Sequence, residues 1–114
     1  VFKHWKIGMD ELAECPNVVI KLGGFGMPIG GFDWHKQNTP PSSKDIADAM
    51  APYYMHCIER FGVDRCMFES NFPVDKVSSS YTVLWNSFKR ITEDFSDRDK
   101  EALFRDTAVG TYRL

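Results

Sequence analysis

The sequence has no long apolar run, no cluster of basic residues and few cysteines. No stretch approaches the roughly 18 apolar residues that a membrane-spanning helix needs, and the first residues lack the pattern of a signal peptide. The 14 Lys and Arg residues are scattered among 16 Asp and Glu residues, which gives a formal net charge of -2. Proteins that bind nucleic acid usually carry a basic stripe. We therefore expect neither a nucleic acid nor a membrane as partner.

The three cysteines, Cys15, Cys57 and Cys66, lie far apart in the sequence. An odd number of cysteines at this spacing argues against a disulfide framework. The sequence also lacks a Cys-x-x-Cys pair of the kind that holds structural zinc. We expect reduced and mostly buried thiols, as is typical of a cytoplasmic protein.

The order of the predicted elements indicates an α/β fold. With 114 residues, of which 43% are hydrophobic, the chain suits one domain with a core. Short apolar runs predict two strands, and apolar residues at helical spacing predict four helices. The strands are expected at 18–22 and 65–68, and the helices at 1–15, 42–61, 81–91 and from 96 onwards. Strands that alternate with helices are typical of βαβ units in a parallel sheet.

Two parallel strands with flanking helices do not bury enough surface to form a stable sheet by themselves. Residues 1–114 are therefore expected to form a single partial domain. Another chain, or a further part of this one, must complete the sheet. Exposed sheet edges pair readily with a copy of the same chain, so we expect a homo-oligomer.

Three blocks of the sequence resemble the amidohydrolase-related enzymes (the amidohydrolase 2 family). Residues 17–24, NVVIKLGG, resemble the family's "pNV-x-x-K-x-SG" strand. Residues 61–74, FGVDRCMFESNFPV, resemble its "FG-x-x-R-x-MFGSDWPV" strand. Residues 103–114, LFRDTAVGTYRL, resemble its final helix, "LF-x-x-NA-x-x-x-Y-x-L". The blocks occur in the family's order and together cover most of the chain.

This resemblance implies a metal-dependent-hydrolase TIM barrel, of which the chain would supply the C-terminal portion. A (β/α)₈ barrel takes about 250 residues, so only the last two strands and their helices would be present. Members of the family open lactones, hydrolyse C–N or C–C bonds, or decarboxylate small acids. The resemblance therefore implies a hydrolase that acts on a small carboxylic, lactone or amide substrate, and a divalent metal such as zinc is possible in the full-length enzyme. The family's metal-binding His-x-His is absent, and His4, His35 and His56 match no family ligand. We expect no metal ligand in this chain.

One departure from the family pattern concerns the catalytic residue. The family's catalytic Asp of "GSDWP" aligns with Asn71, and an amide cannot take a proton from water as a carboxylate does. Glu69, two residues earlier, would point the same way as Asn71 in an extended strand, and Asp75 follows shortly after. We expect Asn71, Glu69 and Asp75 to be the catalytic candidates. The alternative for Asn71 is a turn residue before Phe72-Pro73, and for Glu69 a salt-bridged or exposed acid.

Substrate-binding candidates come from the first strand and the loop after it. Lys21 lies inside a predicted buried strand and needs a partner, for which Glu69 on the neighbouring strand is suited. That pair can be structural or can bind an acidic substrate. The loop at 23–41 lacks the Gly-Lys-Ser/Thr of a phosphate-binding loop. We interpret it either as a substrate-covering lid, with Trp34 and His35 as contacts, or as a disordered segment.

Two functions remain open from the sequence. The first is part of an amidohydrolase-like hydrolase with a small-molecule substrate. The second is a non-catalytic, truncated barrel fragment that folds by oligomerisation. The absence of the family's His-x-His metal ligands and the Asn71 in place of the catalytic Asp favour the non-catalytic fragment. The three blocks that resemble the family favour the hydrolase.

Overall fold

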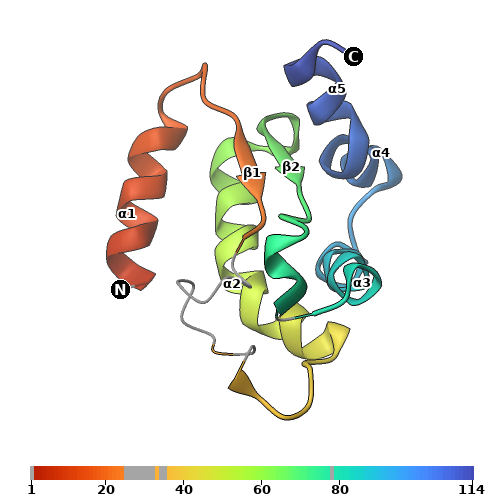
Figure 1. Ribbon diagram of the computed structural model, residues 1–114. Helices are drawn as coiled ribbons and strands as arrows, with labels where there is room; N and C mark the ends of the chain where they lie inside the picture. The colour runs from red at the N-terminus through yellow and green to blue at the C-terminus, as the bar shows by residue number, and fades with distance from the viewer. Residues whose placement is uncertain (1, 25–32, 34–35, 78) are drawn as a thin grey trace.

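The computed structural model describes residues 2–24, 33, 36–77 and 79–114, apart from the side chains of Asp75 and Val77. Figure 1 shows the arrangement of its helices and strands. These are α1 (Phe2–Ala13), β1 (Ile20–Leu22), α2 (Ser43–Phe61), β2 (Cys66–Phe68), α3 (Tyr81–Ile91), α4 (Asp97–Glu101) and α5 (Thr107–Tyr112). Short turns of 3-10 helix, η3 (Val63–Arg65) and η4 (Val74–Val77), flank β2, and a π-helical turn, η5 (Ala102–Asp106), joins α4 to α5.

The predicted order of helices and strands is confirmed, and so is the parallel α/β arrangement. Strands β1 and β2 pair in parallel, with Lys21 opposite Met67. The pairing extends past β2, because the Glu69 N–H donates to the Leu22 carbonyl at 3.1 Å. Both strands are shorter than the sequence predicted. Val18 and Val19 precede β1, and Val19 is exposed.

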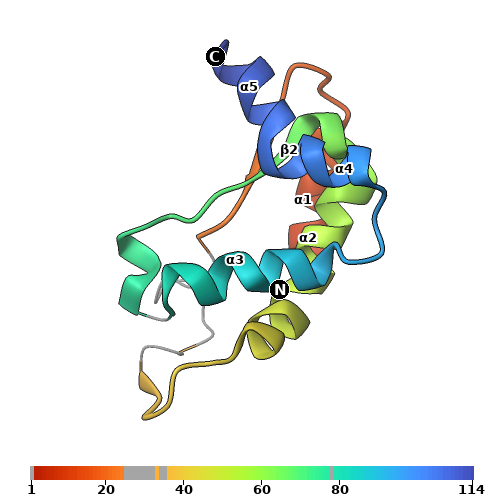
Figure 2. The ribbon, with the colours of Figure 1, turned by 90° about the vertical axis from the view of Figure 1, so that its right-hand side faces the viewer.

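One face of the sheet packs on α2, as Figure 2 shows from the side. Leu22 and Phe68 point into this core, where Phe88 of α3 stacks on Phe68 with ring centroids 4.4 Å apart. Tyr54 of α2 and Phe104 of η5 meet the Phe68 ring at 6.1 and 4.9 Å. This ring packing holds α2, α3 and η5 together around the end of β2.

The opposite face carries Lys21, Met67 and Glu69, and we call it the Lys21 face. In parallel strands alternate residues point to opposite faces, so these three side chains share the side away from Leu22 and Phe68. In Figures 1 and 2 no described helix packs across this face.

Helix α2 begins and ends where the sequence predicted. The Ser42 hydroxyl accepts a hydrogen bond from the Asp45 N–H, and the Asp45 carboxylate accepts one from the Ser42 N–H, both at 3.1 Å. This is a complete capping box. Gly62 ends the helix with φ 81°, a left-handed conformation that glycine adopts at little cost. Pro52 lies inside the helix.

Arg65 fixes the amino ends of both strands. Its guanidinium donates to the carbonyls of Ala13 and Cys15, each at 2.9 Å, and to that of Val18 at 3.3 Å. Its Nε donates to the Phe61 carbonyl at 3.1 Å. Four hydrogen bonds from one side chain therefore join the end of α1, the start of β1 and the end of α2.

Helix α1 is joined to α2 by a polar contact and by rings. His56 Nε2 lies 2.8 Å from the Asp10 carboxylate, and Arg60 Nε lies 3.1 Å from the same oxygen. Trp5 packs edge-on against Tyr53, with ring centroids 5.1 Å apart. His56 is only 8% exposed, so it is a packing residue of the helix interface.

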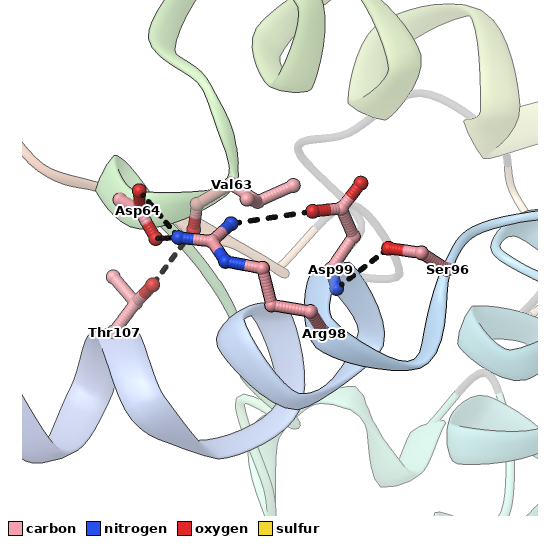
Figure 3. A network of polar contacts seen from close by, with 6 residues as sticks. All are labelled: Val63, Asp64, Ser96, Arg98, Asp99 and Thr107. Atoms are coloured by element: carbon pink, nitrogen blue, oxygen red, sulfur yellow. Dashed lines mark hydrogen bonds and ion pairs between the residues drawn. The ribbon is translucent and has the colours of Figure 1, made fainter.

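A polar network attaches the C-terminal helices to the start of β2 (Figure 3). Both oxygens of Asp64 accept from Arg98 Nη2 at 3.1 Å. The Thr107 hydroxyl donates to the Val63 carbonyl at 2.7 Å. The Ser96 hydroxyl caps α4 by accepting from the Asp99 N–H at 3.1 Å. Together these contacts set the position from which α5 begins.

Among the helices in the described part of the chain, none is both long and apolar enough to cross a membrane.

Candidate functional site

Lys21 and Glu69 form an ion pair at the carboxyl ends of the two strands. Lys21 Nζ lies 3.2 Å from a Glu69 oxygen, and the two side chains are 50% and 28% exposed. The sequence predicted this pair from the neighbouring strands, and the contact is confirmed. Because neither side chain is fully buried, both remain accessible to a ligand on the Lys21 face.

The pKa of Lys21 is raised above its ordinary value. The first cause is the hydrogen bond to Glu69, followed by the negative charge of that carboxylate. Tyr112 of α5 adds to the increase, whereas partial burial opposes it. The ammonium therefore stays charged throughout the physiological pH range.

Gly23 allows Glu69 to approach β1. A Cβ atom on Gly23 would lie 2.5 Å from the Glu69 carbonyl oxygen and would also overlap the Glu69 side chain. The first glycine of the Gly-rich loop therefore serves the close approach of the two strand ends. This role of Gly23 was not expected from the sequence, although Gly23 lies within the block that resembles the family's first strand.

Asn71 has a left-handed backbone, with φ 52°, which asparagine tolerates better than most residues. Strand β2 ends at Phe68, so the expectation that Asn71 continues an extended strand is wrong. The turn role foreseen as the alternative describes its backbone. Its side chain nevertheless lies near the site, since a Cβ on Gly24 would be 3.7 Å from Asn71 Nδ2.

The described residues include only part of the predicted site. Trp34, His35 and the side chain of Asp75 lie outside the described residues. The structure thus brings together Lys21, Glu69 and Asn71, beside Gly23 and Gly24, and adds Tyr112, which the sequence reasoning did not single out. The signal for Tyr112 was present, because it is the Tyr of the closing block.

The described side chains do not fit a zinc centre. Zinc in proteins takes three or four Cys, His or carboxylate ligands. No group of three or more His, Cys, Asp and Glu residues comes together in the portion of the chain that the structure describes. At the strand ends, Glu69 is paired with an ammonium and Asn71 offers an amide in place of a carboxylate. A catalytic metal in this family member would need ligands other than these.

The buried thiols are unsuited to act as nucleophiles. Burial raises the pKa of Cys57 to about 11 and that of Cys66 to about 12. Since the thiolate is the reactive form, both remain inert at neutral pH. Cys15 is exposed, and all three are free.

Comparison with known proteins agrees with the residues at the strand ends. The family profile described as amidohydrolase matches residues 1–114. The chain belongs to the amidohydrolase family. An uncharacterized protein of Sinorhizobium fredii (strain NBRC 101917 / NGR234), y4mH, is 43% identical over 113 residues, which are 99% of this chain and 34% of that protein. The L-fucono-1,5-lactonase of Burkholderia multivorans (strain ATCC 17616 / 249) is 29% identical over 97% of this chain and 36% of its own length.

Solved amidohydrolase structures contain the same arrangement. A Burkholderia multivorans amidohydrolase crystallised with bound zinc superposes with a TM-score of 0.81 at 28% identity, over 96% of this chain and 37% of that one. A crystal form with bound HEPES gives the same TM-score at 29% identity, over 96% and 36%. The two parallel strands and their helices thus match part of an amidohydrolase TIM barrel. The chain spans about a third of the length of the curated relatives it matches.

Proposed function

We propose that this chain supplies one side of the active site of a hydrolase acting on a small carboxylic, lactone or amide compound. The supporting observation is the Lys21–Glu69 pair at the carboxyl ends of adjacent parallel strands in an amidohydrolase-family chain. Barrel enzymes build their active sites at that end. The other strands would come from further segments of the same protein. The relative named L-fucono-1,5-lactonase favours a lactone among the three substrate classes.

In the proposed reaction Glu69 acts as the base. Its carboxylate accepts a proton from water, and the water oxygen attacks the carbonyl carbon of the lactone. The Lys21 ammonium stabilises the negative charge that develops on the carbonyl oxygen. The ring C–O bond then breaks, and the released ring oxygen takes the proton that Glu69 accepted from water. Asn71 contributes hydrogen bonds to the substrate, because its amide can both donate and accept.

The remaining candidates would complete this site. Asp75 is a second carboxylate that can take the proton, and Trp34 and His35 would contact the substrate from the loop. If a divalent metal such as zinc takes part, it would be held by other segments of the protein. Its chemistry would be to polarise the substrate carbonyl or to activate water. The three free thiols support a reducing, cytoplasmic setting.

The substrate class can be tested with the protein expressed from its whole reading frame. L-fucono-1,5-lactone, a linear ester and an amide of the same acid would be compared, with acid release followed by a pH indicator. We expect lactone opening above the spontaneous rate, with the ester and the amide slower. Hydrolysis of none of the three would contradict the proposal.

A non-catalytic fragment that self-associates is the second candidate. The observation in its favour is that the described sheet has two strands, and that the Lys21 side chain on one of its faces is 50% exposed. A second copy of the chain would pair with an edge of this sheet and extend it. Light scattering on the 114-residue chain distinguishes the cases: a multiple of 13.1 kDa supports self-association, and a stable monomer contradicts it.

A further inference from the structure

A groove lies between the end of α3 and η5. It has a volume of about 370 Å³ and is lined by Lys89, Thr92, Lys100 and Phe104. The Phe104 ring packs on Phe68 of the core, with centroids 4.9 Å apart, yet Phe104 is only partly buried. The Thr92 hydroxyl is already used, since it donates to the Phe88 carbonyl at 3.0 Å. The floor of the groove is therefore apolar, and covering it with another apolar group would be favourable.

Positive charge flanks this apolar floor. Within the described part of the chain, neither Lys89 nor Lys100 forms an ion pair or a side-chain hydrogen bond. None of the described residues that line the groove is acidic. Two ammonium groups beside an apolar surface are complementary to a partner that carries a carboxylate among apolar side chains.

Trp85 provides a further group without a partner. It lies four positions before Lys89 in α3, on the same side of the helix, and its ring lies 5.8 Å from that of Phe104. Its Nε1 is buried and has no hydrogen-bond acceptor among the residues that the structure describes. Buried donors in folded proteins are nearly always satisfied. An acceptor from outside the described residues is therefore expected here.

The groove lies on the side of the sheet where a further strand would pair with β2. In Figure 1, α3 and α4 lie beyond β2, away from β1, and Figure 2 views the molecule from that side. In the described sheet β2 pairs only with β1, and two strands do not form a stable sheet by themselves. Segments that complete the sheet at this edge would also lie against the groove.

We propose that this groove is the docking surface for a further segment of the same protein. That segment places an apolar side chain on Phe104 and a carboxylate between Lys89 and Lys100, and it supplies the acceptor for Trp85 Nε1. This rests on the proposed function only in its premise that further segments of the protein complete the sheet. The docking itself requires no turnover.

The first test is carbodiimide cross-linking of the protein expressed from its whole reading frame, followed by mass spectrometry of its peptides. A carbodiimide joins an ammonium group to a carboxylate in direct contact, as an amide, with loss of water. We expect Lys89 or Lys100 to be joined to an Asp or Glu outside residues 1–114. The absence of such a cross-link would overturn the proposal. So would a cross-link of mixed mass in a blend of unlabelled and nitrogen-15-labelled protein, because the carboxylate would then belong to a second copy.

The second test is acetylation of the lysines in the same protein, which measures whether the groove is covered. Lys89 and Lys100 should react at least about tenfold more slowly in the native protein than in urea, because a covered amine reacts only when the segment opens locally. Lys44 is the control, since it is 70% exposed and its partner Asp48 belongs to its own helix. Native Lys89 and Lys100 that react as fast as Lys44 would refute the docking. Neither test measures hydrolysis, so the proposed function can stand or fail independently.

Discussion

Replacing Gly23 with alanine should destabilise the protein, although glycine-to-alanine changes are often favourable. The new Cβ would lie 2.5 Å from the Glu69 carbonyl oxygen. That oxygen belongs to backbone held by the hydrogen bond from Glu69 N–H to Leu22, so it cannot move without disturbing the strand pairing. Overpacking of this kind costs about 1–3 kcal/mol. The lower entropy of the unfolded chain returns about 0.4–1 kcal/mol.

Gly8→Ala is the matched control for this change. Gly8 lies within α1, and a Cβ there would meet nothing within 4 Å. Alanine is favoured over glycine in a helix by about 0.5–1 kcal/mol. Urea denaturation should therefore show Gly8→Ala more stable than the parent and Gly23→Ala less stable, a difference of about 1–3 kcal/mol. If both variants were stabilised equally, the strand ends could not be as close as described.

Three further predictions concern the frame around the site. Arg65→Lys should lower the free energy of unfolding by about 2–4 kcal/mol, since an ammonium cannot replace four guanidinium hydrogen bonds. Arg113→Lys is the control. Equal stability of the two variants would contradict the role of Arg65. A thiol reagent at pH 8 should label Cys15 alone; rapid reaction of Cys57 or Cys66 would contradict their burial. The stability of the fold should fall as the pH rises from about 9 towards 12. In the folded protein the pKa values of Cys57 and Cys66 are raised to about 11 and about 12. The thiols of the unfolded chain therefore lose their protons at a lower pH, which favours unfolding. Cys57→Ser should reduce this slope in pH-dependent urea unfolding, and an unchanged slope would contradict the assignment.

The helices could be predicted from local signals. Apolar residues at helical spacing and the capping box of Ser42 and Asp45 act within a few residues, and both are visible in the sequence. Strand ends depend on pairing with a distant strand, which explains why Val18 and Val19 fell outside β1. The π-helical turn at Ala102–Asp106 was not foreseen, since it carries no distinct composition.

The candidate site was predicted only in part, because some of its features depend on contacts between distant parts of the chain. Lys21 and Glu69 were paired correctly, because a charged residue in a strand needs a neighbour of opposite sign. Asn71 was assumed to continue an extended strand, but a left-handed backbone at this position cannot be read from an asparagine alone. Tyr112 affects the pKa of Lys21 only because α5 docks on β2, and no local pattern in the sequence shows that docking.

The most direct test of the account is the turnover of the Glu69→Gln variant in the protein expressed from its whole reading frame. Glutamine keeps the size of the side chain but cannot accept a proton from water. With L-fucono-1,5-lactone as substrate, we predict that kcat falls by about 100-fold or more, the usual contribution of a positioned base. Glu14→Gln, at an exposed position away from the site, should leave kcat unchanged. Equal turnover of the two variants would show that the carboxylate at the end of β2 is not the base.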